Sequence, residues 1–181
     1  MSDTLLHICC APCSIACIDA LRNEGITPTG FWYNPNIHPY TEYRTRKETL
    51  IAYAKTVGLP LIVNNDYALR PFLRAVGSNF DNRCVTCYQL RMDETARAAA
   101  ERGFSSFTTT LLISPYQQHE LLVQVAKQAA ERYGVEFLYR DFRPLFSDGQ
   151  ERAKELDLYR QKYCGCIFSE EERYRKQKVI R

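Results

Sequence analysis

The segment Leu5-Leu6-His7-Ile8-Cys9-Cys10-Ala11-Pro12-Cys13 joins a short apolar run to three closely spaced thiols. Short apolar runs of this kind are typical of strands buried in a sheet, and we predict a strand over residues 4–9. In open α/β sheets, ligands bind beyond the carboxyl ends of such strands. The thiols at this strand end are therefore candidates for a functional site.

The rest of the chain alternates predicted strands with predicted helices. Further strands are expected at 29–33, 60–64, 104–110 and 135–139, and helices at 14–24, 41–57, 68–76, 83–102, 120–133, 148–162 and 169–178. This alternation favours a parallel sheet that is covered by helices on both faces. Because we find no internal repeat or linker, we expect residues 1–181 to form a single α/β domain with a parallel five-stranded Rossmann-like sheet and helical insertions.

Polar residues follow most of these predicted strands. The five strand ends are Cys9-Cys10, Tyr33-Asn34, Asn64-Asn65-Asp66, Thr109-Thr110 and Arg140-Asp141. Since the carboxyl ends of parallel strands lie at one edge of a sheet, we expect these residues to converge on one crevice.

Composition places the chain among ordinary globular proteins. It has 181 residues, 45% of them hydrophobic and 25% charged, and a net charge of +3, which permits a polyanionic partner without requiring one. No apolar stretch approaches the roughly 18 residues that a membrane span needs. The start, Met1-Ser2-Asp3-Thr4, lacks the features of a signal peptide, so a cytoplasmic location without a membrane partner is expected.

Eight cysteines carry the strongest chemical signal. They form three tight clusters: Cys9, Cys10, Cys13 and Cys17; Cys84 and Cys87; Cys164 and Cys166. Clustered cysteines in a chain with no export signal indicate metal binding or redox chemistry rather than a disulfide framework.

The pair Cys84 and Cys87 forms a CxxC motif near the start of a predicted helix. This spacing puts both sulfurs on one helix face, and a helix N-terminus favours the thiolate form that binds metals. Two cysteines cannot complete a four-coordinate site, so Cys9 and Cys10 are the natural second half. A structural zinc site is the alternative, but zinc more often uses two CxxC motifs, and four thiolates around a [4Fe–4S] cluster fit better.

The Cys164-Gly165-Cys166 segment differs from the other clusters. A disulfide across one residue closes a very small ring and is labile, which suits a redox dithiol; metal binding by this pair is the alternative. Cys13 could bind a second metal or be a small buried residue, and both readings stay open. Cys17, one helical turn further on, is expected in the core.

The histidines and the loops give weaker signals. We expect His7 in the core, His119 at the surface or capping a helix, and His38 in a loop above the crevice, where it could contact substrate. Neither a GxGxxG motif after a strand nor a Walker loop is present, so a bound dinucleotide or ATP is not supported.

Five motifs occur together in a specific order: HICCAPC (7–13), YNPNIHPxxEYxxR (33–46), RCxxCYxLR (83–91), TTLLISPYQ (109–117) and LYRQKYCGCIFS (158–169). The combination resembles the cobalamin-independent epoxyqueuosine reductases of the QueH-type family, and it covers nearly the whole chain.

This resemblance implies reduction of epoxyqueuosine to queuosine at the wobble position of the tRNA anticodon. It also implies an adenine-nucleotide-α-hydrolase-like fold, and a [4Fe–4S] cluster with an additional mononuclear iron as an open alternative. Carried over residue by residue, the cluster thiols are Cys9, Cys10, Cys84 and Cys87, and the redox-active pair is Cys164 with Cys166. The electron donor is not identified by the sequence.

Opening an epoxide to an alkene consumes two electrons and two protons. We expect Asp66 or Asp141 to donate a proton or to bind the additional iron, which could polarise the epoxide oxygen. Unstacked anticodon bases usually stack on aromatic side chains. The candidates for stacking are Trp32, Tyr33 and Tyr40, and those expected to orient the base or phosphate are Arg83, Tyr88 and Arg91.

Two rival functions share some of these features. An iron–sulfur tRNA-thiolating enzyme of similar fold would need a phosphate-binding loop after the first strand, and this loop is absent from the sequence. A zinc-stabilised nucleic-acid-binding module would be a colourless zinc protein rather than a brown iron protein.

Overall fold

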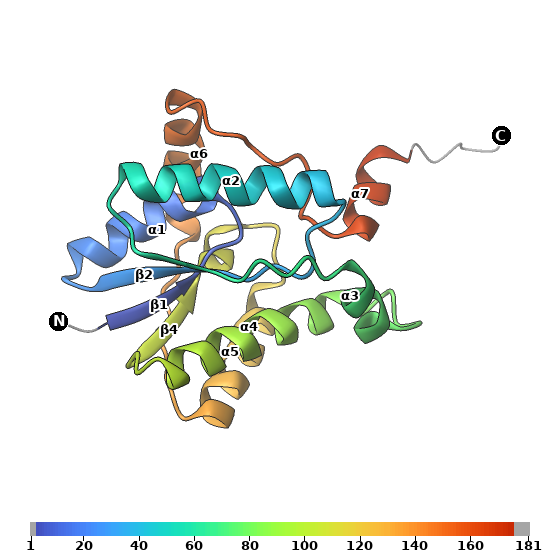
Figure 1. The fold of residues 1–181 in the computed structure, drawn as a ribbon, viewed down its shortest axis with the longest axis horizontal. Coiled ribbons are helices and arrows are strands. Elements are labelled where there is room, and N and C mark those ends of the chain that lie inside the picture. The colour runs from blue at the N-terminus through green and yellow to red at the C-terminus, as the bar shows by residue number, and fades with distance from the viewer. Residues whose placement is uncertain (1–2, 176–181) are drawn as a thin grey trace.

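The computed structural model describes residues 3–175 and contains one parallel sheet with helices on both faces (Figure 1). Its elements are β1 (Asp3–His7), α1 (Ala11–Asn23), β2 (Thr27–Trp32), α2 (Tyr40–Thr56), β3 (Leu61–Val63), α3 (Leu69–Val76), α4 (Arg83–Glu101), β4 (Ser106–Thr109), the 3₁₀ helix η1 (Thr110–Ile113), α5 (His119–Tyr133), β5 (Glu136–Phe137), the 3₁₀ helix η2 (Arg143–Leu145), α6 (Phe146–Glu155) and α7 (Ile167–Tyr174).

The five strands lie in the order β3-β2-β1-β4-β5, and every pair is parallel. The α/β fold class and the five-stranded sheet are therefore confirmed. The strand order reverses between β1 and β4, and ligands bind at such a switch point beyond the carboxyl ends of the strands. Cys9 and Cys10 follow β1, and Thr110 follows β4, so this point lies at the first thiols.

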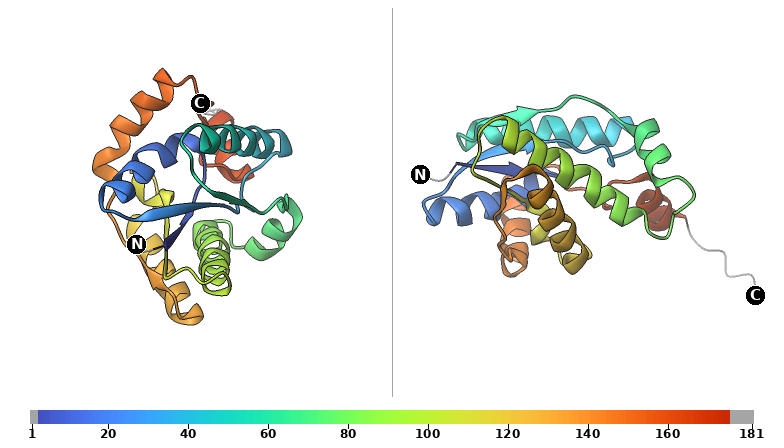
Figure 2. Two further views of the ribbon diagram at one scale, coloured as in Figure 1. Left: turned by 60° about the vertical axis from the view of Figure 1, so that its left-hand side comes forward. Right: turned by 90° about the horizontal axis from the view of Figure 1, so that it is seen from below.

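Helices α1 and α2 lie on one side of the sheet, with α6 packed against α1, and α4 and α5 lie on the other side (Figure 1). The end of the molecule to which the strands point carries α3 and α7, as Figure 1 and the view from below in Figure 2 show. Residues far apart in sequence therefore meet beyond the strand ends.

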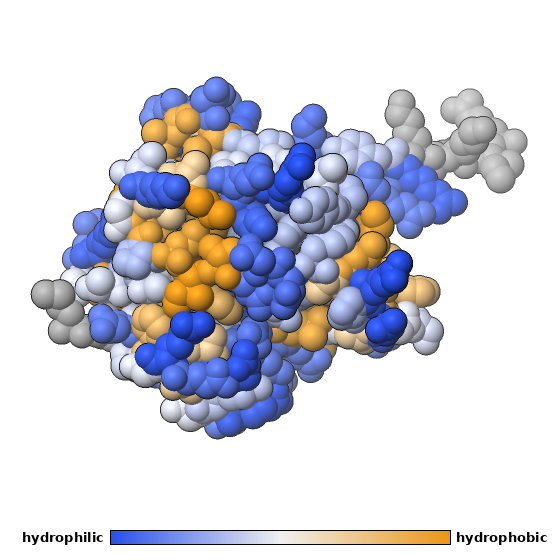
Figure 3. Space-filling model, in the orientation of Figure 1, coloured by the Kyte–Doolittle hydropathy of each residue, from blue (hydrophilic) through white to orange (hydrophobic). Residues whose placement is uncertain are grey.

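The core is built from the apolar faces of these layers. Leu5 and Leu6 in the central strand and Ile8 directly after it are fully buried, and Gly30 in β2 leaves room for the edge strand. A Cβ on Gly30 would lie 2.8 Å from Leu61 Cδ1, so a larger residue there would push β3 away. Beside β3, the surface is apolar where α2 runs along the edge of the sheet (Figure 3), and Ile51, Leu59 and neighbouring residues line a hollow there.

Two predicted helix boundaries are wrong in ways that affect the site. Helix α1 begins at Ala11 rather than at residue 14, because Pro12 fits the first helical turn, where its missing N–H is not needed. Cys10 therefore stands at the N-cap and Cys13 in the first turn.

The helix expected over 148–162 ends at Glu155, and Asp157 has a positive φ of 49°. Residues 156–166, which we call the CGC loop, lie instead along the start of α2, where Tyr159 Oη donates a hydrogen bond to Glu42. Tertiary contacts here override helix propensity. The last predicted helix begins at Ile167, and its expected end at 176–178 lies outside the described residues.

None of the helices in residues 3–175 has the length and apolar character to cross a bilayer.

Candidate metal and thiol site

The first thiol group comprises Cys9, Cys10 and Cys13, which we call the strand-end trio. All three are buried, and their sulfur atoms lie within 4.8 Å of one another. Within residues 3–175 this is the one set of three or more cysteine, histidine or carboxylate side chains that is gathered so closely. Cys13, which the sequence left ambiguous, belongs to this group because α1 begins early and places it one turn after the N-cap.

Two polar side chains from other parts of the chain hold the trio in place. Thr110, at the end of β4, accepts a hydrogen bond from Cys9 N (3.2 Å), and its hydroxyl donates to Cys9 Sγ (3.5 Å). Gln161 in the CGC loop donates from Nε2 to Cys10 Sγ (3.1 Å) and Cys13 Sγ (3.7 Å). Its Oε1 is buried and has no partner among the described residues.

The protonation of the trio is unequal. Hydrogen bonds from Cys10 and Cys13 lower the pKa of Cys9, with help from Thr110. Burial raises the pKa of Cys10. The pKa of Cys13 is also raised, mainly by the hydrogen bond between Cys13 and Cys10. Without a metal, one negative charge would therefore reside mainly on Cys9.

The second thiol group, which we call the helix group, comprises Cys84 and Cys87 in the first turns of α4 and Cys166 before α7. Cys87 and Cys166 pack in one small apolar cluster with Phe72 and Val76. Burial raises the pKa of Cys87 to about 12, against the opposing effect of the Arg91 guanidinium, and it also raises the pKa of Cys84. In the metal-free protein, burial therefore outweighs the effect of the helix N-terminus on the pKa of both thiols.

The charge of Arg91 acts on thiols of both groups and of the CGC loop. Its side chain is buried, Nη2 donates to Cys87 Sγ at 3.0 Å, and it interacts electrostatically with Cys87, Cys164 and Cys9. No ion pair among the described residues involves Arg91. A buried guanidinium without a carboxylate favours an anionic partner, and thiolates bound to a metal would supply one.

The CGC loop is fixed by contacts with α2 and the loop before it. Buried Arg46 donates from Nη1 to Cys164 O and from Nη2 to Tyr163 O, both at 3.0 Å, and pairs with Glu42 at 2.7 Å. Gly165 has a φ of 143°, and a Cβ there would come within 3.3 Å of Arg46 Nη1, so glycine is required.

His38 braces the same loop rather than contacting substrate. Its backbone N–H donates to Gly165 O (2.8 Å), its Nδ1 accepts from Ile167 N (3.3 Å), and Nε2 donates to Pro35 O (3.0 Å). Burial lowers the pKa of His38 to about 4, which keeps the ring neutral. His7 is also a core residue, as expected, with both ring nitrogens hydrogen-bonded.

A cavity of about 320 Å³ opens beside the trio. Its wall includes Cys9, Cys13 and Cys164, three glutamines, and the three aromatic residues Tyr116, Phe146 and Tyr163. Cys164 is exposed, and Gln117 Nε2 donates to its sulfur at 3.6 Å, while Tyr88 Oη donates to Gln117 Oε1 at 2.7 Å. The structure thus brings the CGC loop and the strand-end trio to one cavity, which sequence spacing could not show.

The predicted crevice is only partly formed by the strand ends. Cys9 after β1 and Thr110 after β4 line the cavity, whereas none of the cavity residues follows β2, β3 or β5. Asp66 is exposed, and so is Asp141, which pairs with Arg143 at 2.7 Å. The hydrogen bond from Arg143 lowers the pKa of Asp141 to about 2.

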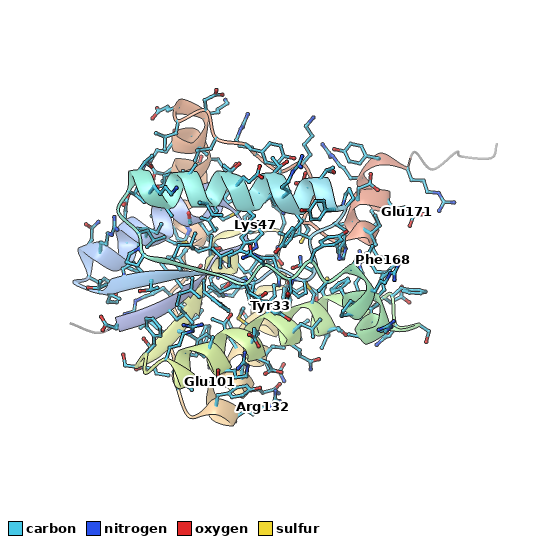
Figure 4. All side chains as sticks on the ribbon, in the orientation of Figure 1. Tyr33, Lys47, Glu101, Arg132, Phe168 and Glu171 are labelled. Carbon is cyan, nitrogen blue, oxygen red and sulfur yellow. The ribbon has the colours of Figure 1, made fainter. Side chains whose placement is uncertain are left out.

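Several residues expected at the substrate lie elsewhere. Trp32 is fully buried in β2, and Tyr33, which Figure 4 labels in the interior between α2 and α4, is partly buried. Tyr88 and Arg91 are also buried, so they support the thiols and cannot touch a base directly. Arg83 pairs with Glu172 and lies over the Phe168 ring of α7, the helix on which Figure 4 labels Phe168 and Glu171. His119 is buried rather than exposed, with Nε2 3.1 Å from Tyr139 Oη.

Thr110 was expected at the crevice as a strand-end residue, but sequence reasoning missed Gln161, Arg46 and Tyr116. All three stand inside the recognised motifs, but a motif does not show which of its side chains face a thiol or a cavity.

The donor set fits a metal. The Sγ atoms of Cys9 and Cys10 are 3.8 Å apart, which is about the edge of a tetrahedron of thiolates at 2.3 Å from one ion. A [4Fe–4S] cluster binds each thiolate to a different iron, so Cys9 and Cys10 would have to spread apart to bind it. The buried thiols, the unpartnered amide oxygen of Gln161 and the unpaired charge of Arg91 are all compatible with an anionic metal centre here.

Known proteins match this chain over nearly its whole length. The family model described as "Epoxyqueuosine reductase QueH" matches residues 4–172. Proteins named Epoxyqueuosine reductase QueH are 40% identical in Dehalococcoides mccartyi, over 95% of this chain and 94% of that one, and 36% identical in Thermotoga maritima, over 99% and 96%. The Haemophilus influenzae protein of the same name is 38% identical over 91% of this chain and 70% of its own.

A solved structure shows the same fold. The predicted subunit of a tRNA methyltransferase from Methanocaldococcus jannaschii superposes with a TM-score of 0.58, over 86% of this chain and 75% of that one. Its sequence identity of 12% means that this likeness concerns the fold alone.

Proposed function

Because the chain belongs to the epoxyqueuosine reductase family QueH and is therefore an oxidoreductase, we propose that it reduces epoxyqueuosine in the tRNA anticodon to queuosine with a metal centre and a redox dithiol. The observation that carries the mechanism is the shared cavity, because the trio's Cys9 and the CGC loop's Cys164 both line it. The substrate is tRNA with the modified base at the wobble position, which places the enzyme in the cytoplasm.

Oxidation of the dithiol supplies the electrons and protons that reduction of the epoxide consumes. Two thiols release two electrons and two protons when they form a disulfide, and the epoxide takes up the same two electrons and two protons to give an alkene and water. Cys164 is the group that substrate can reach, and Cys166 is its partner. Cys166 packs against Cys87 rather than facing the cavity, so disulfide formation requires the CGC loop to rearrange. An external electron donor, not yet identified, then restores both thiols.

The metal ligands that we propose are Cys9, Cys10, Cys84 and Cys87 for a [4Fe–4S] cluster, with Cys13 binding an additional mononuclear iron. When bound, such a centre supplies electrons one at a time and a Lewis-acidic position for the epoxide oxygen. Thr110 and Gln161 hold the thiols of the trio toward the cavity, and Arg91 compensates negative charge on the thiolates.

Asp66 and Asp141 are proposed as the acidic groups of the reaction. The ion pair with Arg143 keeps Asp141 ionised at neutral pH, so this carboxylate suits metal binding better than proton donation. Asp66 is exposed and forms no ion pair among the described residues, and we propose it as the proton donor.

The test is an anaerobic preparation incubated with epoxyqueuosine-containing tRNA and dithionite, followed by nucleoside analysis. We expect brown protein containing iron and sulfide, and conversion of epoxyqueuosine to queuosine. Colourless protein with stoichiometric zinc would overturn the proposed cofactor, and an intact iron centre that forms no queuosine would overturn the proposed reaction.

A further inference from the structure

The rim of the cavity carries the most exposed large hydrophobic side chain of the described residues. Tyr116, between η1 and α5, is 85% exposed, whereas the others of this kind range from 37% to 52%. Single exposed aromatic side chains are common, so exposure alone would mean little. What distinguishes Tyr116 is that it lines the same cavity as Cys9, Cys13 and Cys164.

The Tyr116 ring is held in position without being covered. Phe146, the first residue of α6, packs against it nearly at a right angle (81°) with the ring centroids 5.9 Å apart. In this edge-to-face arrangement one ring supports the other while a face remains free. The backbone is anchored as well, since Tyr116 N donates to Ser114 Oγ (3.3 Å).

The other walls of the cavity carry groups that suit a nucleobase. Gln117, Gln150 and Gln161 contribute neutral amides, which can both donate to and accept from the edge of a base. Lys162 is the single charged side chain of the lining. Cys9 and Cys13 are buried whereas Tyr116 is exposed, so the thiols of the trio lie deeper in the cavity than the Tyr116 ring.

In the substrate, the flat base and the reactive epoxide are likewise separate parts. In epoxyqueuosine the epoxide is on a cyclopentane ring that a methylamine link joins to the deazaguanine base. The base and the reacting carbons are thus separate, and the base can remain at the rim while the epoxide reaches the thiols.

We propose that the face of Tyr116, braced by Phe146, is the surface on which the epoxyqueuosine base stacks when it leaves the anticodon stack. This inference rests on the proposed function and replaces Trp32, Tyr33 and Tyr40 as the expected stacking residues. Trp32 is buried, and neither Tyr33 nor Tyr40 lines the cavity. Unstacked bases in RNA complexes are commonly held on such exposed rings.

The experiment compares Tyr116→Ala and Tyr116→Phe in the anaerobic holoenzyme. The probe is an anticodon stem-loop RNA carrying epoxyqueuosine, and its Kd is measured by fluorescence anisotropy next to a stem-loop with guanine at the wobble position. Loss of one base–aromatic stack should weaken binding of the modified RNA roughly 5- to 150-fold in Tyr116→Ala. Tyr116→Phe keeps the ring and should stay within about twofold of wild type.

Tyr40→Ala is the matched control, because Tyr40 is also exposed (51%) but lies outside the cavity lining. It should bind the modified RNA as wild type does. In turnover, Tyr116→Ala should raise KM for the RNA far more than it lowers kcat, and its iron content should be unchanged.

Wild-type binding of the modified RNA by Tyr116→Ala, or a loss confined to Tyr40→Ala, would overturn the inference. These results are distinguishable from failure of the proposed function, which would appear as absence of turnover in the wild-type enzyme itself. Equal weakening of both RNAs would likewise count against stacking of the modified base.

Discussion

The strand-end trio and the helix group differ in where their residues come from and in what surrounds them. Cys9, Cys10 and Cys13 lie within five consecutive residues and form a close set of sulfurs without help from distant thiols. Cys84 and Cys87 come from the middle of the chain and Cys166 from near its C-terminal end, and the buried guanidinium of Arg91 lies against Cys87. The trio is therefore a ligand set made by local geometry, whereas the helix group depends on how α4 and the CGC loop pack.

The two thiol groups also differ in whether they line the cavity. Two members of the trio line it, while the members of the helix group do not, and only Cys164 joins the lining from the CGC loop. This arrangement assigns contact with substrate to the trio and Cys164, and it assigns charge and support to the helix group. The following predictions test that division, from the largest expected effect to the smallest.

Replacing Cys164 should have the largest effect on turnover. Cys164→Ser removes the one thiol of the CGC pair that faces the cavity, and queuosine formation should fall roughly 10³-fold or more while iron and sulfide content stay at wild-type levels. Nucleoside analysis and metal assays on the same preparation measure both quantities.

The control is Cys17→Ala, because Cys17 is a fully buried core residue outside both thiol groups. It should retain metal and turnover. If Cys164→Ser lost its iron, this cysteine would be a metal ligand, and the redox-dithiol reading would be wrong.

Arg46→Met should break the anchor of the CGC loop. It leaves the carbonyls of Tyr163 and Cys164 and the carboxylate of Glu42 without their buried partner, so the free energy of unfolding should fall by about 3–5 kcal/mol. Urea unfolding measures the loss, and hydrogen exchange should increase selectively at residues 156–166.

Arg46→Lys is the graded control, since lysine keeps the charge but lacks the planar guanidinium fork that holds two carbonyls and a carboxylate in fixed geometry. Its loss of stability should be smaller. An equal increase in hydrogen exchange over the whole chain of Arg46→Met, relative to wild type, would contradict a role specific to the loop.

Cys13 tests whether the trio holds an ion separate from the cluster. If Cys13 binds the additional iron, Cys13→Ser should lower the iron-to-sulfide ratio toward one without loss of sulfide, whereas Cys87→Ser should lower iron and sulfide together. Parallel iron and sulfide assays decide this, and an unchanged ratio in Cys13→Ser would remove Cys13 from the ligand set.

The smallest effect concerns pH. His38 has a pKa of about 4 in the folded protein and 6.5 as the ordinary value, so the unfolded state binds a proton more readily between these values. The contribution of His38 to stability is complete above pH 6.5 and is lost as pH falls toward 4. Chemical unfolding at several pH values should show a shallower dependence in His38→Gln, and an identical pH dependence would refute this role of His38.

Much of the fold follows from local patterns. The apolar runs and their spacing predict all five strands and seven of the helical segments, because burial on both faces of a parallel sheet selects continuous apolar strands. Boundaries were less accurate where tertiary contacts compete with propensity, as at Asp157, after which the chain follows α2 instead of continuing a helix.

The candidate site likewise has features that the sequence predicts and features that only tertiary packing decides. The sequence by itself determined the thiols, the family motifs and the position of Cys9 and Cys10 at the end of the central strand, because residue type, spacing and strand period are local properties. Only the tertiary structure decided that Cys13 joins this pair, that Cys164 reaches the same cavity, and that Tyr116 rather than Trp32 is free to meet a base. Those facts depend on the helix start at Ala11 and on the course of the CGC loop, which is set by Arg46 and His38 from more than a hundred residues away in the chain.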